Sequence, residues 1–360
     1  MEMVNKKANI KILTLVPRFN IYSSISQQAL LISKLIESRL GYRIDIKGCD
    51  PRKSLSPNIK GALRESDIIF YHYGMFDRNI SRIIKLAPAI LIFHNVTPFK
   101  YLWKWKPLTA TIALLGSLQL RLLPKNVRWI AVSPYNQHIL RKAGFKNIEF
   151  CPALIDERYR DRGYNRQNII SFIGRITPNK YPHELFSVVK RVAEQLEYRI
   201  KLIIIGGFKK RDAYVRYFEK TFGKIINSSL VDVEWFKEPV PTEEIVEILN
   251  RSYVYVSLSR HEGFGLPVCE AIACGCPALY YSCGGTESIL NCHGSIPVGN
   301  EDILVKTLIT LFRDRHEREV LLLNQQEQIQ ALLLPNAAEA IISKYSRFML
   351  DIGSGNKRKK

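Results

Sequence analysis

Long hydrophobic runs are missing from this 360-residue sequence. A membrane-spanning helix needs about 18 consecutive apolar residues, and the nearest candidate, 108–120, is shorter and includes Thr, Ser and Gln. The first residues also lack the apolar segment of a secretory leader. Seven cysteines are an odd number, so we expect a reduced, cytoplasmic setting in which they pack as small hydrophobic residues. A composition of 46% hydrophobic and 24% charged residues excludes a wholly disordered or fibrous chain.

Acidic residues are scarce in the first half of the chain. Residues 1–150 contain 24 basic and 8 acidic side chains, whereas residues 151–356 contain 25 of each. The last four residues, 357–360, are all basic and complete the net charge of +20. A basic half joined to a neutral half predicts an anionic partner, such as a membrane surface. Nucleic acid is the alternative partner, but the aromatic residues form no stacking motif and the second half carries no excess charge, so we do not expect it.

Short apolar runs alternate with helical patterns along most of the chain. The apolar runs predict strands at 10–16, 44–46, 68–73, 90–93, 129–132, 148–151, 169–173, 202–205, 231–235, 254–258 and 278–280. The main helical patterns lie at 24–40, 133–143, 183–196, 212–222, 242–250, 267–274, 303–312 and 337–350. Such alternation predicts parallel sheets with helices on both faces. We therefore expect an α/β fold of two tandem, doubly wound, Rossmann-like domains that face a cleft.

The pattern also suggests where the domains begin and end. An irregular, Arg-rich segment at 152–167 interrupts the alternation and reads as a linker. We expect a first domain at 1–155 and a second at 156–335. A helix at 336–352 would pack back toward the first domain, and 353–360 would form a disordered basic tail.

Loops that follow the strands of the second domain contain the candidate chemistry, because ligands bind at the carboxyl ends of parallel strands. Arg175 and Lys180 follow strand 169–173. A guanidinium group and an ammonium group together suit a diphosphate, although such residues taken alone are more often solvated. Gly206 and Gly207 follow the next strand, where glycines either let the backbone approach a ligand or simply complete the turn.

Two glutamates flank the start of a predicted helix in the same domain. Glu262 lies in the loop before the helix and Glu270 lies one turn inside it, with Pro267 at the helix start. Free N–H groups at such a terminus favour an anion, and two carboxylates so placed could bind hydroxyl groups at both ends of a polyol. The alternative for Glu270 is a charge that only offsets the helix dipole.

Together these loops resemble the C-terminal domain of the family-four retaining glycosyltransferases, also called glycosyl transferases group one, which have the GT-B fold. The pattern reads Gly-Arg-x4-Lys, Gly-Gly, Glu-Gly-Phe-Gly-Leu-Pro-x-x-Glu-Ala and Gly-Gly-Thr-Glu between about 165 and 290. A weaker resemblance covers 94–98 and 132–136 in the first domain. The two glutamates separated by seven residues are the most specific part of the pattern.

The resemblance implies a role for each matching residue. Arg175 and Lys180 would bind the diphosphate of a nucleotide-sugar donor, Glu262 would bind hydroxyl groups of the sugar, and Glu270 would bind the ribose. His94, after strand 90–93, would contact the donor sugar, and His72 is a weaker candidate. The expected catalytic residues are thus Glu262, His94, Arg175 and Lys180. The full expected donor-binding set is Arg175, Lys180, Gly206, Gly207, Glu262, Gly263, Phe264, Gly265, Leu266 and Glu270.

The resemblance further implies transfer with retention at the anomeric carbon, with no metal and no cofactor. The absence of an Asp-x-Asp tripeptide fits this, because two cations and helix-end N–H groups could stabilise the departing diphosphate. A two-carboxylate mechanism is the competing possibility and needs the carboxyl groups about 5–5.5 Å apart. We favour front-face transfer, since a diphosphate needs little general acid. The crowded cysteines at 269–292 lack the paired spacing of a zinc site.

The stretch 99–129 is the most unusual part of the first domain. Tryptophans alternate with lysines and precede an apolar helix pattern, which suits a membrane interface; the alternative is an ordinary buried helix with tryptophans packed beneath it. Most relatives carry a Gly-Gly turn after the first strand, whereas loop 17–24 has no glycine. The residues expected to meet acceptor or membrane are Arg18, Trp103, Lys104, Trp105, Lys106 and Arg121.

The sequence thus predicts a metal-independent hexosyltransferase that uses a GDP- or UDP-linked sugar. Its expected acceptor is lipid-linked or a glycan, in the assembly of a cell-surface polysaccharide such as lipopolysaccharide. We expect a cytoplasmic protein bound peripherally to the anionic inner face of the cell membrane. The alternatives are a catalytically inactive nucleotide-sugar-binding regulator and a nucleic-acid-binding protein.

Overall fold

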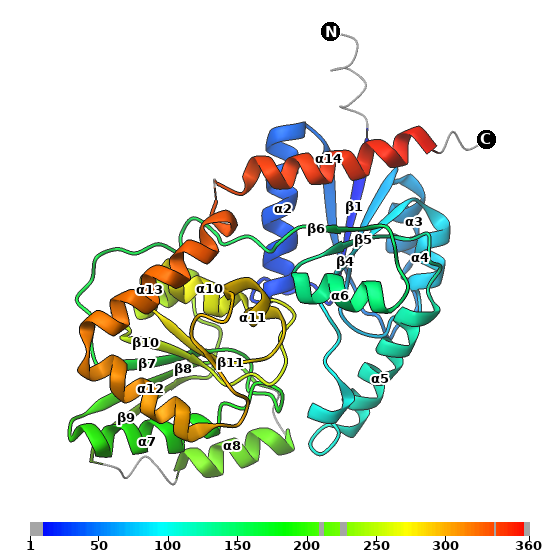
Figure 1. Cartoon of the computed structure of the whole chain (residues 1–360). Coiled ribbons are helices and arrows are strands. Elements are labelled where there is room, and N and C mark those ends of the chain that lie inside the picture. The colour runs from blue at the N-terminus through cyan, green and yellow to red at the C-terminus, as the bar shows by residue number, and fades with distance from the viewer. Residues whose placement is uncertain (1–9, 209–211, 224–228, 335, 356–360) are drawn as a thin grey trace. The chain divides into compact units, whose positions relative to one another are not determined.

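The computed structural model describes residues 10–208, 212–223, 229–334 and 336–355, and for 351–355 only the backbone. The chain divides into two compact units (Figure 1). Among the described residues, the first unit comprises 10–98, 111–154, 334 and 336–355, and the second comprises 99–110, 155–208, 212–223 and 229–333. Each unit is an α/β structure built on one parallel six-stranded sheet, which confirms the predicted fold class.

The sheet of the first unit has the strand order β2-β1-β3-β4-β5-β6. Its central strands are continuous apolar runs, as expected where helices cover both faces of a sheet; every residue of β3 is buried. All six predicted strands are present, with bounds shifted by a few residues at most. They are β1 (Lys11–Pro17), β2 (Arg43–Cys49), β3 (Ile68–Tyr73), β4 (Ala89–Phe93), β5 (Arg128–Ala131) and β6 (Ile148–Phe150).

Helices connect these strands, and local sequence sets where they begin and end. The Ser133 hydroxyl accepts a hydrogen bond from Asn136 N (3.1 Å) and Pro134 occupies the first turn, so α6 begins there. Helix α2 ends at Gly41, which adopts a positive φ of 70°. The helices of this part of the chain are α2 (Ser24–Leu40), α3 (Pro57–Glu65), α4 (Ile80–Leu86), η1 (Phe99–Tyr101), α5 (Pro107–Leu122) and α6 (Pro134–Lys142).

The last helix, α14 (Ala338–Gly355), packs on the first unit, where it lies against α2 (Figure 1). The fully buried Tyr345 ring lies edge-on to Phe70 of β3, with 5.3 Å between ring centroids. Lys344 Nζ donates to the carbonyl of Phe150, at the end of β6 (2.6 Å). The chain therefore returns to its first sheet after completing the second.

The second unit repeats the architecture with the strand order β12-β11-β10-β7-β8-β9. Its strands are β7 (Ile169–Ile173), β8 (Ile200–Ile205), β9 (Val231–Phe236), β10 (Val254–Ser257), β11 (Ala278–Tyr281) and β12 (Ser295–Ile296). Its helices are α7 (Glu184–Leu196), α8 (Ala213–Gly223), α9 (Thr242–Arg251), α10 (Leu266–Ala273), α11 (Gly285–Leu290), α12 (Glu301–Arg313), α13 (Arg315–Ile329) and η2 (Gln330–Leu332). Because every strand pair is parallel, the loops after β7, β8, β10 and β11 meet at one edge of the sheet.

Helix α13 has no counterpart in the sequence prediction because its buried side is partly polar. Gln325 is fully buried and replaces a missing strand neighbour: its Oε1 accepts from Ala278 N (2.9 Å) and its Nε2 donates to Ala278 O (2.7 Å). Arg318 donates in the same way to the carbonyl of Tyr253 (3.0 Å). Apolar periodicity, the signal used for helices, does not detect such a face.

Residues 99–110 belong to the second unit, although the sequence analysis placed them in the first domain. Trp105 packs edge-on against Tyr214 and beside Tyr217, with ring centroids 5.5 and 5.1 Å apart. Lys106 pairs with Asp212 at 2.5 Å and is only 17% exposed. Both residues were expected at an acceptor or membrane surface, and the structure shows that each also has partners inside the second unit. The alternation of Trp with Lys suits an aromatic cluster inside the protein as well as it suits a membrane interface.

No helix among the described residues is both long enough and apolar enough to cross a membrane.

Candidate functional site

The loops after β7 and β8 touch at a point where a side chain would not fit. A Cβ on Gly206 would lie 2.1 Å from the carbonyl oxygen of Gly174, so only glycine allows this approach. Ile176 N donates to the carbonyl of Gly207 (3.2 Å), and Gly174 N donates to that of Ile205 (2.9 Å). The two glycine motifs that sequence analysis singled out therefore form one continuous surface.

The loops after β10 and β11 are joined in the same way. Glu262 N donates to Cys283 O (3.3 Å), and Gly285 N donates to Glu262 O (3.1 Å). A Cβ on Gly285 would lie 2.3 Å from the backbone of Gly263. Gly265, just before α10, has a φ of 93°, and its Cβ position lies 2.1 Å from Thr286 Oγ1. Gly285 must be glycine because a side chain would not fit, and Gly265 must be glycine because of both the limited space and its positive φ.

Lys180 and Glu262 form a hydrogen-bonded ion pair between Nζ and Oε1. The two side chains are only 15% and 14% exposed, although they are 82 residues apart in sequence. Burial raises the pKa of Glu262. The charge of Lys180 and the hydrogen bonds from Lys180 and the Ser259 hydroxyl lower it by more than burial raises it, so the net pKa is below the usual value. Glu262 is therefore an ionised carboxylate in this site.

Glu270 lies in α10 and is in the opposite protonation state. Burial, with a smaller contribution from the charge of Asp156, raises its pKa to about 8 despite a hydrogen bond from Tyr159. Its side chain is buried, as is that of Tyr159. At neutral pH this carboxyl group is therefore mainly protonated in the unliganded protein. Tyr159 was not among the predicted site residues, because its partner is distant in sequence and it lies in the segment interpreted as a linker.

Arg175 is the most accessible of the predicted donor-binding side chains. It is exposed, and no residue in the described part of the chain forms a hydrogen bond or ion pair with its guanidinium group. The neighbouring Phe264 and Leu266 are buried, so any contact that they make with a ligand would come from their backbone. The structure thus gathers Lys180, Glu262 and the four glycine-bearing loops at one sheet edge.

His94 follows β4 in the first unit and forms a pair with His72 of β3. His72 Nδ1 and His94 Nε2 lie 2.7 Å apart, and the rings stack at 5.0 Å with 15° between their planes. Burial lowers the pKa of His94 to about 4 and also lowers that of His72. Both rings are therefore neutral at physiological pH, and one must donate the shared hydrogen bond while the other accepts it.

The loop after His94 is fixed by asparagines. Asn95 has a positive φ of 75°, and its Oδ1 accepts from Val96 N (2.7 Å). Its Nδ2 donates to Asn136 (2.9 Å), whose own Nδ2 donates to the carbonyl of Phe93 (3.0 Å). The two weaker sequence motifs of the first domain therefore contact one another directly.

The glycine-free loop after β1 reaches its turn through a strained arginine. Arg18 has a φ of 52°, donates its backbone N–H to Cys49 O (3.3 Å) and pairs with Asp50 (3.5 Å). The residues that follow, Phe19, Ile21 and Tyr22, are exposed. This loop therefore presents side chains rather than bare backbone. Trp103, Lys104 and Arg121, also predicted for acceptor or membrane, are exposed as well.

Within the described residues, no three His, Cys, Asp or Glu side chains are grouped so that they could hold a metal ion. All seven cysteines are free thiols, and six of them are buried.

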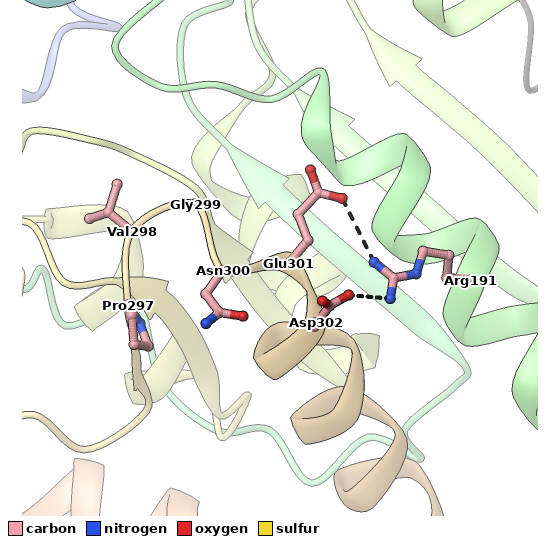
Figure 2. A pocket seen from close by; sticks show the side chains of 7 residues that line it. All are labelled: Arg191, Pro297, Val298, Gly299, Asn300, Glu301 and Asp302. Atoms are coloured by element: carbon pink, nitrogen blue, oxygen red, sulfur yellow. Dashed lines mark hydrogen bonds and ion pairs between the residues drawn. The ribbon is translucent and has the colours of Figure 1, made fainter.

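A surface pocket of about 490 Å³ lies at the start of α12 (Figure 2). Arg191 of α7 forms ion pairs with two acidic residues of α12, Asp302 at 2.6 Å and Glu301 at 4.0 Å. None of the candidate donor-binding residues lines it, and its carboxylates disfavour a diphosphate. The lining residues are Arg191, Pro297, Val298, Gly299, Asn300, Glu301 and Asp302.

Comparison with known proteins agrees with the motifs of the second unit. Residues 156–328 match the family model described as glycosyl transferases group 1. This part of the chain, just under half of its length, resembles that family, and the chain as a whole has the GT-B fold.

Individual relatives are distant. The D-inositol 3-phosphate glycosyltransferase of Stackebrandtia nassauensis is 28% identical over 139 residues, which are 37% of this chain and 31% of that protein. The chain thus spans about a third of the length of this curated relative. Sucrose-phosphate synthase from Thermosynechococcus elongatus superposes with a TM-score of 0.76 at 14% identity over 96% of this chain and all of that one. HepE of Anabaena, solved with UDP and glucose, superposes with a TM-score of 0.67 at 14% identity. The match covers 95% of this chain and 100% of that one.

Proposed function

We propose that the chain is a retaining, metal-independent glycosyltransferase that transfers a hexose from a UDP- or GDP-linked donor. The observation that supports this most strongly is the buried Lys180–Glu262 ion pair at the sheet edge, next to exposed Arg175. It lies within the part of the chain that matches the family model. HepE, a protein of the same fold, binds UDP and glucose, which supports a nucleotide-sugar ligand.

The chemistry of each side chain suggests how the donor is bound. Lys180 and Arg175 offset the charge of the diphosphate. The Glu262 carboxylate accepts hydrogen bonds from hydroxyl groups of the sugar, and Glu270 binds the ribose. The backbone of Gly206, Gly207 and of the turn Gly263, Phe264, Gly265 and Leu266 faces the sugar and the phosphates. His94, which is neutral, contacts the sugar as a hydrogen-bonding partner rather than as a base.

In the reaction, the bond from the anomeric carbon to the diphosphate oxygen breaks, and a bond to the acceptor oxygen forms on the same face. The departing diphosphate gains negative charge, which Lys180 and Arg175 stabilise. The acceptor hydroxyl loses its proton to the diphosphate oxygen. Glu262, with its lowered pKa, is a poor general acid, so a side-chain proton donor is not part of this scheme.

We further propose a lipid-linked or glycan acceptor in the assembly of a cell-surface polysaccharide such as lipopolysaccharide. Two features support an anionic membrane partner at the inner face of the cell membrane. The first 150 residues carry most of the net positive charge. Helix α5 exposes Leu115, Leu118 and Leu122 next to Arg121, a combination that binds anionic membrane surfaces. Trp103 and Lys104 remain exposed and contribute in the same way.

The transfer reaction is tested with a panel of UDP- and GDP-linked hexoses and a membrane extract as acceptor. We expect one donor to give product with the donor's anomeric configuration, without added metal. Glu262→Gln should lower the rate about 10- to 150-fold, as expected for a lost charge-assisted contact of about 1.5–3 kcal/mol. Donor binding without transfer or hydrolysis by the unaltered protein would instead indicate the regulator, and duplex or RNA binding with steep salt dependence would indicate a nucleic-acid binder.

Membrane binding is tested by sedimentation with liposomes that contain anionic lipid. We expect Leu118→Ser with Leu122→Ser to reduce binding severalfold, because each loses apolar contact with the lipid. Leu323→Ser is the matched control, since Leu323 is also exposed but lies on α13. Equal loss in the control, or no loss in the pair, would contradict α5 as the membrane-binding surface.

A further inference from the structure

Arg260 links the two loops of the candidate donor site by contacts that involve only the protein. It precedes His261 and Glu262, and its Nη2 donates to Glu184 Oε1 at 2.7 Å. Glu184 begins α7, the helix that follows the loop of Arg175 and Lys180. The Tyr281 hydroxyl donates to the other oxygen of Glu184 at 3.2 Å. Arg260, Glu184 and Tyr281 thus connect the loop after β10 with α7 and β11.

Arg260 also contacts both neighbours of Lys180. Its backbone N–H donates to Asn179 O (2.8 Å). Its guanidinium carbon lies 3.5 Å from the centroid of the Tyr181 ring, a short cation–π contact. Tyr181 has a φ of 51°, which a residue other than glycine seldom adopts without support. Arg260 therefore holds the backbone on each side of the lysine that pairs with Glu262.

The contacts of Arg260 are shielded from solvent. The side chain of Glu184 is 14% exposed and that of Arg260 is 26% exposed, and Tyr281 is fully buried. Burial raises the pKa of Glu184, and the charge of Arg260 opposes this rise. Removing one partner of a shielded ion pair destabilises the structure around it, because the other charge is left without a partner.

A donor would compete with the direct contact between the loops. Phosphate oxygens bind the Lys180 ammonium and sugar hydroxyls bind the Glu262 carboxylate, so the Lys180–Glu262 pair must loosen when the donor enters. The contacts of Arg260 with Glu184, Tyr181 and Asn179 engage no group assigned to the donor. They therefore persist in the loaded site, where the direct pair does not.

We propose that Arg260 is a positioning residue that holds the Lys180 loop against the Glu262 loop and thereby sets affinity for the donor diphosphate. The inference rests on the proposed function, because it assigns the diphosphate to Lys180. Arg260 itself does not touch the donor. Glu184 orients Arg260, and Tyr281 orients Glu184.

The test is calorimetric titration of the full chain with UDP and GDP, using Arg260→Ala, Arg260→Lys and Glu184→Gln. We expect Arg260→Ala to weaken binding of the preferred nucleotide about tenfold. Arg260→Lys keeps the positive charge but loses the planar guanidinium group that stacks on Tyr181. Its nucleotide affinity should therefore lie between those of the unaltered chain and Arg260→Ala. Arg191→Ala is the matched control: Arg191 lies on α7 and pairs with Asp302 at 2.6 Å, and its loss should change affinity less than twofold.

A double-mutant cycle separates positioning from general structural support. In a Lys180→Ala background, Arg260→Ala should add less than a twofold loss, because Arg260 acts through Lys180. Full additivity, or a lowered melting temperature with unchanged nucleotide affinity, would overturn the inference while leaving the proposed function intact. If the unaltered chain binds neither nucleotide, the proposed function fails and the inference fails with it.

Discussion

The two glutamates of the candidate site differ in protonation because their nearest neighbours differ. Both are buried, and burial alone disfavours the ionised form. Glu262 has the ammonium group of Lys180 beside it and is ionised, whereas Glu270 faces the charge of Asp156 and has a pKa of about 8. The spacing of the two acids is visible in the sequence. Their charge states are not, because these depend on Lys180, Tyr159 and Asp156 at distant positions in the chain.

The state of Glu270 predicts how stability depends on pH. Its folded pKa of about 8 lies above the unfolded value near 4.5, so the folded protein binds an extra proton between these values. The stability that this group contributes is therefore lost as pH rises toward and through 8. We expect the melting temperature of the unaltered protein to fall more between pH 6 and pH 9 than that of Glu270→Gln. Parallel curves for the two proteins would show that Glu270 is already ionised at pH 6.

The histidine pair predicts an unusual titration in the first unit. Because burial lowers the pKa of His94 to about 4, its ring should remain neutral at pH 5.5, where an exposed histidine is mostly charged. Nitrogen NMR of histidine-labelled protein measures this directly, with the free amino acid as the reference. His72→Phe should change the tautomer balance of His94, since it removes the shared hydrogen bond. A His94 that titrates near pH 6.5 would contradict this description of the pair.

At the scale of elements, the loops of the second unit depend on glycines that sequence analysis could note but not explain. The motif around Gly206 and Gly207 allowed either a close approach to a ligand or a simple turn. The structure shows a third reason, because Gly206 lies against the backbone of Gly174. Helix α13 was not predicted at all. Its buried polar residue Gln325 makes hydrogen bonds in place of a strand, and apolar periodicity does not detect such a residue.

Gly206→Ala should destabilise the second unit. The added Cβ would meet a backbone oxygen at 2.1 Å, so the backbone must move, at a cost of about 1–3 kcal/mol. Gly61→Ala is the control, because a Cβ there meets no atom within 4 Å and the residue lies in α3; it should stabilise by about 0.5–1 kcal/mol. Chemical denaturation measures both changes. Equal stability of the two variants would mean that the loops after β7 and β8 do not touch as described.

Substitution of two tryptophans in one short segment should change the free energy of unfolding by different amounts. Trp105 packs on Tyr214 and Tyr217, and Trp103 is 58% exposed. Trp105→Ala should cost about 2–4 kcal/mol, near the range for large-to-small core changes, whereas Trp103→Ala should stay within about 0.5 kcal/mol. Similar small effects of the two substitutions would favour the membrane interpretation of Trp105.

For the whole molecule, the sequence predicted the fold class well because parallel sheets have a strong signal. Buried strands such as β3 and β7 are short apolar runs with helices between them, and their bounds match those in the structure. Membership of the units was harder to predict. Residues 99–110 lie between β4 and β5 of the first sheet in sequence but pack with the second unit through Trp105 and Lys106. Such long-range packing has no local signature.

The most direct test of the central claim is nucleotide affinity, measured by calorimetry with UDP and GDP on the unaltered chain, Lys180→Ala and Lys201→Ala. Lys201 is a matched lysine of the second unit that pairs with Glu234 at 2.7 Å in a more exposed setting. We predict that one nucleotide binds, that Lys180→Ala weakens it about 10- to 150-fold, and that Lys201→Ala leaves it unchanged. Undiminished binding by Lys180→Ala, or binding of neither nucleotide by the unaltered chain, would contradict the account.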